Sequence, residues 1–457
     1  MDETLADVLS YLPPPAVSTA ASLSYSFASA ASPDEEETDR IGRLPDALLR
    51  NIISRLPTKD AARTSTLASR WRHLWASNPL VLDDDAGGLA AAVAAAALAS
   101  HPGPVRSARL VASQDDPDAV ASVFGSLAAK DVEDLLVVVN GSWPAEWHVP
   151  SDVLGCASLR RLWIGLSQFP DTTGIAPVLL SIQELGIVHS SVQDRDLHAV
   201  IPRCPELETL ALVRTQDYPR YVHVWSESLR CVVLWKSMLR EVHLDDTPNL
   251  ERLLVEPIAD AATHIKIIKS PKLKILGYFD VGLHQLKIGT TVIKLGTKVK
   301  PSAMVRTLRT LALKVQFGVD DQVKLVPLLL KCFPCLETLY IMSVPSELPV
   351  SVEVGFWDQV GYTECVYSHL KKLVFEAVRG EDNELEFAMF VMERAQMLED
   401  MHVFVDGSCS RDVVLSRLST EGCVSADARV MVERHDVSHA WNFQRATDRS
   451  WRDPFDC

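Results

Sequence analysis

The sequence lacks an excess of positive charge, which excludes one group of functions. Its 457 residues include 45 lysines and arginines against 60 aspartates and glutamates, giving a formal net charge of −15. A protein that binds nucleic acid or an anionic membrane through its overall charge needs the opposite balance. We therefore predict no membrane partner and no nucleic-acid partner, unless a local basic patch provides one.

Ordered cysteines and long apolar runs are also missing. The nine cysteines are odd in number and widely scattered, unlike the disulfide framework of a secreted domain. Residues Met1–Thr4 lack the basic start of a secretory signal. The alanine-rich run Gly87–Ser100 is shorter than the roughly 20 residues that a membrane span needs. We expect a soluble protein of the cytoplasm, the nucleus or both.

Motifs that carry catalysis are absent as well. The chain has no glycine-rich phosphate loop, nucleophile elbow or kinase motif set. Cys332 and Cys335 form a C-x-x-C without a second ligand pair, and we interpret them as structural cysteines between a helix and a strand. His435 and His439 are four residues apart but lack further ligands. We predict no catalytic residue, no metal site and no cofactor.

What the sequence does have is ample apolar material and more than one kind of segment. Hydrophobic residues make up 47% of the chain, enough for a buried core. The length of 457 residues exceeds the roughly 250–300 residues that one core supports. We therefore expect several domains or a solenoid. Residues 1–38, with the Pro13–Pro15 run and an acidic stretch, indicate a flexible leader. The exception is a stripe of apolar residues with helical spacing, Leu5, Val8, Leu9 and Leu12. It predicts a short helix that either contacts the body of the protein or makes no contact at all.

Residues 40–78 predict a module of three short helices. The first helix is marked by apolar residues at every fourth position, namely Leu44, Leu48, Ile52 and Leu56. Pro45 suits its first turn and Pro57 ends it. A second helix follows from Thr58, and the third carries Trp71, Leu74 and Trp75. So small a unit buries too little apolar surface to be comfortably stable alone, so we expect a partner or the next domain to cover part of it.

The rest of the chain is dominated by a leucine repeat. After an alanine-rich connecting helix (86–104), residues 105–405 contain copies of Leu-x-x-Leu-x-Leu. The starts at 207, 229, 250 and 273 lie 22, 21 and 23 residues apart, and later steps reach 35 (273 to 308). Leucine-rich repeats have steps of about 20–29 residues. Stacked units would share one core beneath a parallel sheet, while segments such as 196–201 and 322–330 return behind it as helices.

The expected fold class is therefore α/β: a small three-helix module followed by a curved leucine-rich-repeat solenoid with a concave parallel β-sheet. Strand alternation predicts the side chains that reach the concave face. They include Arg161, Trp163, Val233, Trp235, Arg252, Phe279, Tyr340 and Lys372. Aromatic residues on such a face are typical interface anchors, but loops or terminal segments could equally cover them. An error of one residue in the register would reverse every assignment.

Lysines gather between residues 264 and 300. They are Lys266, Lys269, Lys272, Lys274, Lys287, Lys294, Lys298 and Lys300. Such a cluster could bind an acidic or phosphorylated partner, or it could be a solvated edge of the solenoid. We favour the solvated edge.

The segments Leu44–Leu49, Leu56–Ala61 and Ser65–Trp75, in this order, resemble a plant F-box. The whole arrangement resembles the plant F-box/leucine-rich-repeat family, and residues 367–405 resemble its FBD segment. Residues 406–457 match no part of that pattern.

The resemblance implies a function without catalysis. F-box modules bind the Skp-type adaptor of a cullin-based SCF ubiquitin ligase, and the repeats capture a target protein. By motif position, the adaptor contact involves Leu44, Pro45, Leu48, Ile52, Leu56, Pro57, Leu67, Trp71, Leu74 and Trp75, some of which must instead form the module's core. The partners implied are a Skp-type adaptor, through it a cullin, and an unidentified target. The alternative is an adaptor-bound scaffold that acts outside a ligase.

Overall fold

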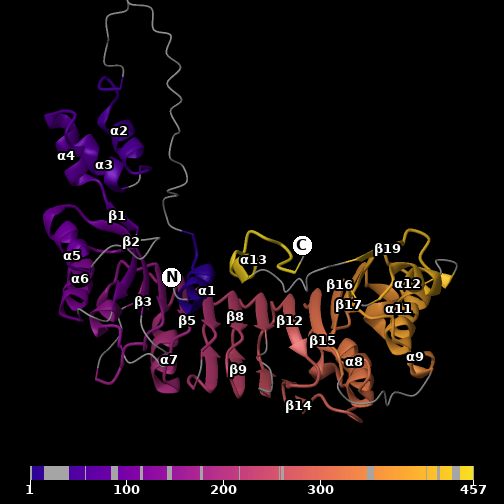
Figure 1. Ribbon diagram of the computed structural model, residues 1–457. Helices are drawn as coiled ribbons and strands as arrows, with labels where there is room; N and C mark the ends of the chain where they lie inside the picture. The colour runs from indigo at the N-terminus through magenta and orange to yellow at the C-terminus, as the bar shows by residue number, and fades with distance from the viewer. Residues whose placement is uncertain are drawn as a thin grey trace, which may run out of the picture. The chain divides into compact units, whose positions relative to one another are not determined.

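The computed structural model confirms the α/β class, with a large parallel sheet accompanied by helices (Figure 1). It describes residues 3–14, 41–56, 58–83, 91–113, 117–140, 147–174, 179–215, 217–256, 258, 262–346, 355–407, 409–418, 422–434 and 443–455. The chain divides into two compact units, Met1–Ser190 and Ser191–Cys457. Among the described helices, none is long and apolar enough to cross a membrane.

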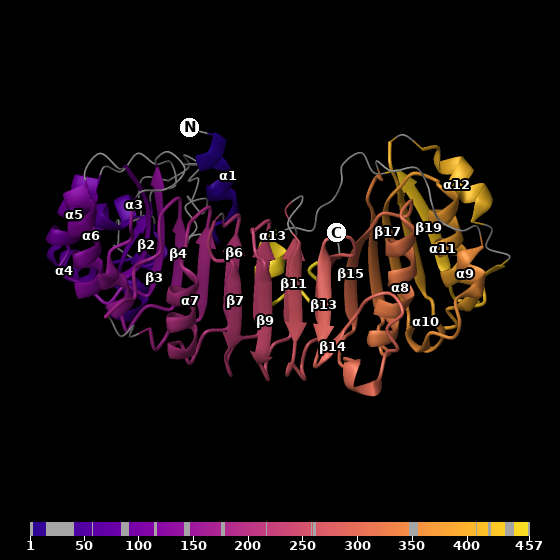
Figure 2. The same cartoon turned by 90° about the horizontal axis from the view of Figure 1, so that it is seen from below.

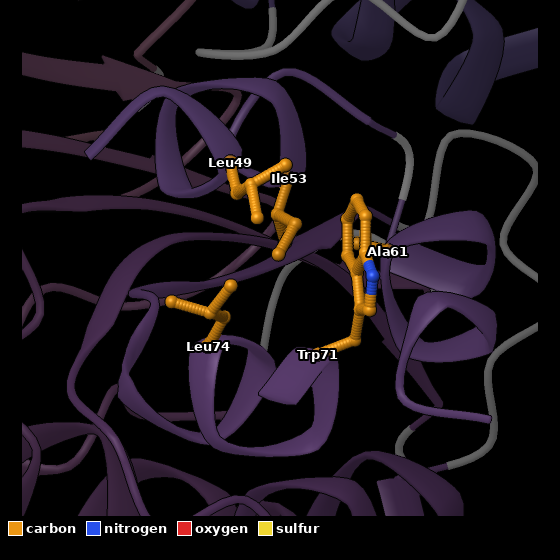
Figure 3. Packing of buried hydrophobic residues seen from close by; sticks show 5 residues of the cluster. All are labelled: Leu49, Ile53, Ala61, Trp71 and Leu74. Carbon is orange, nitrogen blue, oxygen red and sulfur yellow. The ribbon is translucent and has the colours of Figure 1, made fainter. Parts of the chain in front are cut away.

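The first unit begins with α1 (Glu3–Tyr11) and continues with a three-helix module of α2 (Asp46–Ile53), α3 (Thr58–Thr64) and α4 (Ser69–Ser77). Leu49 and Ile53 of α2 point toward Trp71 and Leu74 of α4, with Ala61 of α3 beside them (Figure 3). Leu49 and Ile53 are four residues apart, so they lie on one face of α2, and this face packs inward while the period-four residues Leu48 and Ile52 stay exposed. These five side chains form the core of the module.

A short strand that the repeat pattern did not predict joins the module to the repeats. β1 (Leu80–Asp83) pairs in parallel with β2 (Val105–Ser113). Just before it, the buried Asn78 side chain donates a 3.0 Å hydrogen bond to the carbonyl of Arg50. The carbonyl of Asn78 lies 2.9 Å from Nε2 of His101, whose ring packs against Trp75 at 5.0 Å between centroids. The module is therefore held to the first repeat by buried polar contacts.

The repeats of the first unit form a parallel sheet in the order β1-β2-β3-β4-β5. The further strands are β3 (Asp134–Asn140), β4 (Arg161–Gly165) and β5 (Glu184–Val188). Helices α5 (Ala91–Ser100) and α6 (Pro117–Ala129) pack together, and η2 (Ser151–Gly155) precedes β4. Helix α5 lies inside the alanine-rich segment 86–104, of which residues 86–90 are outside the described residues.

The second unit continues the pattern with parallel strands in the order β6-β8-β10-β12-β15-β16-β17-β18-β19. They are β6 (Thr209–Val213), β8 (Cys231–Trp235), β10 (Arg252–Glu256), β12 (Ile275–Asp280), β15 (Thr310–Val315), β16 (Thr338–Ser343), β17 (Lys372–Val378), β18 (Asp400–Val405) and β19 (Arg429–Arg434). The repeat leucines Leu253, Leu311 and Leu339 are fully buried on one side of this sheet. We call the opposite side, where Arg252 and Tyr340 point, the outer face.

The central repeats differ from the prediction that their return segments are helical. α7 (Asp194–Val200), with η3 (Ile201–Arg203), and α8 (Asp320–Cys332) are helices as expected. Between them, however, a second sheet forms in the order β14-β13-β11-β9-β7 (Figure 2). Its strands are β7 (Tyr221–Trp225), β9 (Glu241–Asp246), β11 (Thr263–Ile267), β13 (His284–Ile288) and β14 (Thr291–Val292). Steps of 21 to 23 residues leave little chain for a helix, and alternation such as Val222-x-Val224 favours a strand.

The longer steps at the end of the chain carry helices instead. They are α9 (Phe356–Gln359), α10 (Glu364–Ser368), α11 (Asp382–Arg394) and α12 (Arg411–Arg417). The 3-10 helix η4 (Pro301–Ala303) precedes β15, and α13 (Phe443–Thr447) follows the last strand. Helix α11 begins with a capping box in which Glu381 and Glu384 satisfy each other's backbone N–H groups.

A buried histidine predicts how the stability of the second unit changes with pH. His284 is 5% exposed, and its Nδ1 accepts a 3.0 Å hydrogen bond from the backbone N–H of Asp280. Burial, helped by the Lys314 ammonium, lowers the pKa of His284 to about 3. In the unfolded chain the pKa is about 6.5, so below that pH the unfolded state binds a proton that the folded state does not. Stability is therefore lost as the pH falls below 6.5, by about 2 kcal/mol at pH 5.

Comparison of the wild type with His284→Asn tests this prediction, because asparagine keeps an acceptor and does not titrate. The free energy of unfolding in urea is measured for both proteins near pH 7.5 and pH 5. We expect the wild type to lose about 2 kcal/mol more than the variant. Glu376, whose pKa burial raises to about 7, titrates in both proteins and so cancels. The same pH dependence in both would contradict a neutral buried ring.

Candidate functional site

The three-helix module exposes large apolar side chains beside its complete core. Leu48 and Ile52 are 52% and 39% exposed and lie one turn apart on α2, next to the buried pair Leu49 and Ile53. Leu67 is 67% exposed, before α4. Exposed apolar side chains that lie side by side are typical of a protein-binding site. We call Leu48 and Ile52, which are neighbours on α2, the exposed apolar patch.

Other residues predicted at the adaptor contact have different places. Trp71 and Leu74 are buried in the module's core, which corrects their assignment to a docking surface, because the inner side of α4 faces α2. Leu44, Leu56 and Trp75 are partly buried against that core, and Pro45 is exposed. Pro57 lies outside the described residues.

Arg70 orients the start of α2, a role that sequence reasoning missed. Its guanidinium pairs with the Asp46 carboxylate at 2.6 Å and donates to the carbonyls of Leu44 (2.6 Å) and Gly42. Arg70 therefore ties the beginning of α4 to the turn that positions Leu48.

In the first unit, the predicted concave residues Arg161 and Trp163 are already engaged by neighbouring repeats. Arg161 donates to the Asp134 carboxylate at 2.7 Å. Trp163 is 1% exposed and donates from Nε1 to Glu184 at 2.6 Å. Its indole lies across Gly186, where an added Cβ would come within 2.2 Å of the ring. Trp163 is therefore closed to a partner, whereas 21% of the Arg161 side chain remains exposed.

The N-terminal helix covers the same side of this sheet. An added Cβ on Gly165 of β4 would lie 2.9 Å from the Val8 side chain. Leu5, Val8 and Leu12 are buried, and Asp7 lies 3.5 Å from Nε2 of His189. The apolar stripe of α1 thus packs on the body, as its spacing indicated. Residues 15–38 of the predicted flexible leader lie outside the described residues.

In the second unit, residues 443–455, which we call the C-terminal segment, cover the outer face. α13 lies on the side of β8 away from β9 (Figures 1 and 2). Phe443 packs edge-on against Trp235 at 5.5 Å between centroids, and Phe455 packs on Tyr340 at 5.3 Å. Trp235, Tyr340 and Val233 are all at most 5% exposed. Of the two alternatives left open by the sequence, coverage by a terminal segment holds here.

Arg252 is the polar centre of this contact. It is 6% exposed, and its guanidinium donates to the carbonyls of Asp448 (3.2 Å), Arg449 (3.4 Å) and Trp451. Lys372, by contrast, is partly exposed, with Nζ 5.8 Å above the ring of Tyr340.

The face predicted for Phe279 is wrong. The register between β12 and β15 shifts after Leu276, so that Phe279 pairs with Leu313 on the core side. Its ring packs against His284 of the second sheet at 5.2 Å. Tyr278 takes the outer position instead and packs against Phe455 at 5.2 Å.

A buried ionic cluster lies beside Tyr278. Lys314 and Glu256 form a 2.6 Å ion pair, with 14% and 6% of their side chains exposed. The Tyr278 hydroxyl donates to Glu376 at 3.4 Å, and the Lys314 ammonium lies 5.9 Å from the Tyr278 ring. Despite these neighbours, burial raises the pKa of Glu376 to about 7. Lys314 pairs with Glu256, and its charge also favours the ionised forms of Glu376 and Asp280, so we expect the stability of the cluster to depend on Lys314.

Part of the lysine cluster serves ion pairs and hydrogen bonds between successive repeats. Lys269 pairs with Asp246 at 2.8 Å and Lys274 with Glu251 at 3.0 Å. Lys272 donates to the side chain of Asn249 at 2.6 Å. These contacts favour the solvated-edge interpretation for this part of the cluster.

The cysteines and histidines offer little chemistry. Burial raises the pKa of Cys332 to about 12, so its thiol stays protonated and unsuited to redox or metal binding. His223 and His243 stack at 4.3 Å on neighbouring strands, with Asp245 close enough to complete a three-ligand set. Nε2 of His243 already contacts Glu241 at 3.0 Å. His435 and His439 lie outside the described residues.

Comparison with known proteins agrees with this domain organisation. Residues 41–83 match the F-box domain, residues 120–341 match the family model described as "FBD-associated F-box protein At5g56370, LRR repeats", and residues 360–403 match FBD. Among curated proteins of Arabidopsis thaliana, F-box/FBD/LRR-repeat protein At4g00160 is 25% identical over 79% of this chain and 85% of its own length. F-box/LRR-repeat protein 13 is 23% identical over 87% and 97%, and FBD-associated F-box protein At5g38590 is 26% identical over 86% and 100%.

An F-box, a leucine-rich-repeat body and an FBD segment, in that order, define a class of F-box proteins. The chain carries the domains of the plant F-box proteins with leucine-rich repeats and an FBD segment, as its sequence motifs predicted. The F-box implies binding to a Skp-type adaptor. The C-terminal segment lies beyond the three matched regions.

Proposed function

We propose that this protein is the substrate-recognition subunit of an SCF-type ubiquitin ligase. The F-box binds the Skp-type adaptor, through which a cullin is recruited, and the repeats bind the target protein. The observation that carries the proposal is the exposed apolar patch, because Leu48 and Ile52 stay in solvent although the module's core is complete. We expect the protein to act in the cytoplasm, the nucleus or both.

The proposed role needs no catalytic residue in this chain. A ligase receptor raises the local concentration of its target beside the ubiquitin-charged enzyme, so its contribution is proximity. The matched F-box and leucine-rich repeats support this, since proteins with these domains are generally substrate adaptors.

Reconstitution tests the ligase role. The purified chain is mixed with a Skp-type adaptor, a cullin and a RING protein, and complexes are separated by gel filtration. We expect all four to elute together, and a chain lacking residues 40–78 to elute alone. Elution with the adaptor but without the cullin would instead favour a scaffold that acts outside a ligase. Loss of a bound partner in cells, prevented by a proteasome inhibitor, would separate the same two functions.

A further inference from the structure

The C-terminal segment contacts the outer face in the manner of a bound peptide. Its two ends are aromatic anchors: Phe443 packs on Trp235, and Phe455 packs between Tyr278 and Tyr340. These partners belong to β8, β12 and β16, so thirteen residues run across the sheet rather than along one strand. Buried aromatic anchors are the usual centres of binding energy at protein interfaces.

Between the anchors, the face recognises main chain. Arg252 donates to three carbonyls of the segment, and the Cys231 thiol lies 3.6 Å from the carbonyl of Ala446. Every peptide offers carbonyls of this kind, so these contacts would accept other sequences.

Two side-chain pairs add selectivity. Glu208 pairs with Arg449, and the Tyr340 hydroxyl donates to the Asp453 carboxylate at 3.2 Å. The face thus prefers a segment that contains, in this order, an aromatic residue, a basic residue, a carboxylate and a second aromatic residue.

The segment is held by few buried side chains. Within it, only Phe443, Ala446, Pro454 and Phe455 are buried, and Trp451 is 45% exposed. It is not a strand of either sheet, and its helix α13 has five residues. Segments with few buried apolar contacts open at low free-energy cost. Release of the segment would uncover Trp235, Arg252 and Tyr340 together.

We propose that the outer face of β8–β16 is a peptide-binding surface that the C-terminal segment occupies in the unbound protein, and that a target displaces it with an unfolded segment of the same chemistry. The inference rests on the proposed function, which assigns target capture to the repeats. It makes the C-terminal segment an intramolecular competitor. Because the segment is tethered to β19 through residues 435–442, it has the advantage of a high local concentration.

A synthetic peptide of residues 443–455, labelled with a fluorophore, tests the proposal on the full-length chain. Phe443→Ala with Phe455→Ala weakens the tethered copy and leaves the face intact. We expect this variant to bind the peptide at least about tenfold more tightly than the wild type does, because the competitor is weakened. Adding Arg252→Gln should remove the gain. Equal binding to wild type and variant, or no binding to the variant, would overturn the proposal.

A surface variant tests the proposal if the protein with Phe443→Ala and Phe455→Ala does not fold. Arg449 and Glu208 have 31% and 35% of their side chains exposed, so reversing their charges spares the core. Arg449→Glu should speed hydrogen exchange in residues 443–455 at least about fivefold, and Glu208→Arg combined with Arg449→Glu should restore protection. Unchanged exchange in Arg449→Glu would show a fixed structural element and overturn the proposal.

Binding of the Skp-type adaptor is measured on the same proteins. We expect it to be unchanged, because the variants leave the F-box untouched. Failure of adaptor binding in all of them would count against the proposed function, whereas failure of peptide competition with normal adaptor binding would count against this inference alone.

Discussion

Replacing Leu48 and Ile52 together by aspartate is expected to abolish co-purification of the Skp-type adaptor. The two side chains are 52% and 39% exposed, whereas their neighbours Leu49 and Ile53 fill the core. Loss of two apolar anchors at about 2 kcal/mol each corresponds to about a thousandfold weaker binding. Two carboxylates forced into an apolar interface would weaken it further. The dissociation constant of purified chain and adaptor measures the effect.

Ala47→Asp with Asn51→Asp is the matched control. It adds the same charge to the same helix at the same spacing, and both residues are exposed outside the Leu48–Ile52 stripe. We expect affinity within about threefold of the wild type, since surface changes away from an interface have small effects. Circular dichroism checks that all three proteins are folded. Equal loss of adaptor in both double variants would point to charge or helix damage and would contradict a contact through the exposed apolar patch.

The repeat architecture could be predicted from the sequence because its signal is local and recurs. Each copy of the leucine pattern places its buried side chains by strand alternation alone, as at Leu253 and Leu339. The apolar spacing likewise predicted a helix at α2, but the residues that form its core face are Leu49 and Ile53, not the period-four residues Leu48 and Ile52. Which apolar residues stay exposed depends on how the three helices pack together. The sequence pattern therefore could not distinguish the buried Trp71 from the exposed Leu48.

Two features depend on information that the leucine pattern does not carry. The register of β12 shifts at Gly277, which has a φ of +147° and no room for a Cβ, since Ala312 would lie 2.5 Å away. That shift turns Phe279 to the core and Tyr278 outward. Coverage of the outer face depends on contacts between distant residues, such as Arg252 and Trp451, 199 positions apart. The sequence signal for this coverage was the aromatic residues Phe443, Trp451 and Phe455 in a mostly polar segment, and it does not say which face they contact.

Lys314→Met is expected to lower the free energy of unfolding of the second unit by about 3–5 kcal/mol, because it leaves a carboxylate buried without its cation. Lys314 pairs with Glu256 at 2.6 Å, and 6% of the Glu256 side chain is exposed. Its charge also stabilises the ionised form of Glu376, whose pKa burial nonetheless raises to about 7. Methionine keeps the length of the lysine stem, so the loss reports the charge rather than a cavity. Urea unfolding near pH 8, where Glu376 is largely ionised, measures the change.

A double-mutant cycle separates the ion pair from other effects of the substitution. Glu256→Gln in the Lys314→Met background removes the carboxylate that has lost the Lys314 ammonium, and replacing a buried ion pair by neutral groups is often close to neutral. We therefore expect the double variant to recover at least about half of the loss. Lowering the pH to about 6 should also reduce the cost of Lys314→Met, since Glu376 is then protonated and needs the cation less. A loss below about 1 kcal/mol in Lys314→Met, or no recovery in the double variant, would mean that this ion pair does not hold the outer face of the sheet together.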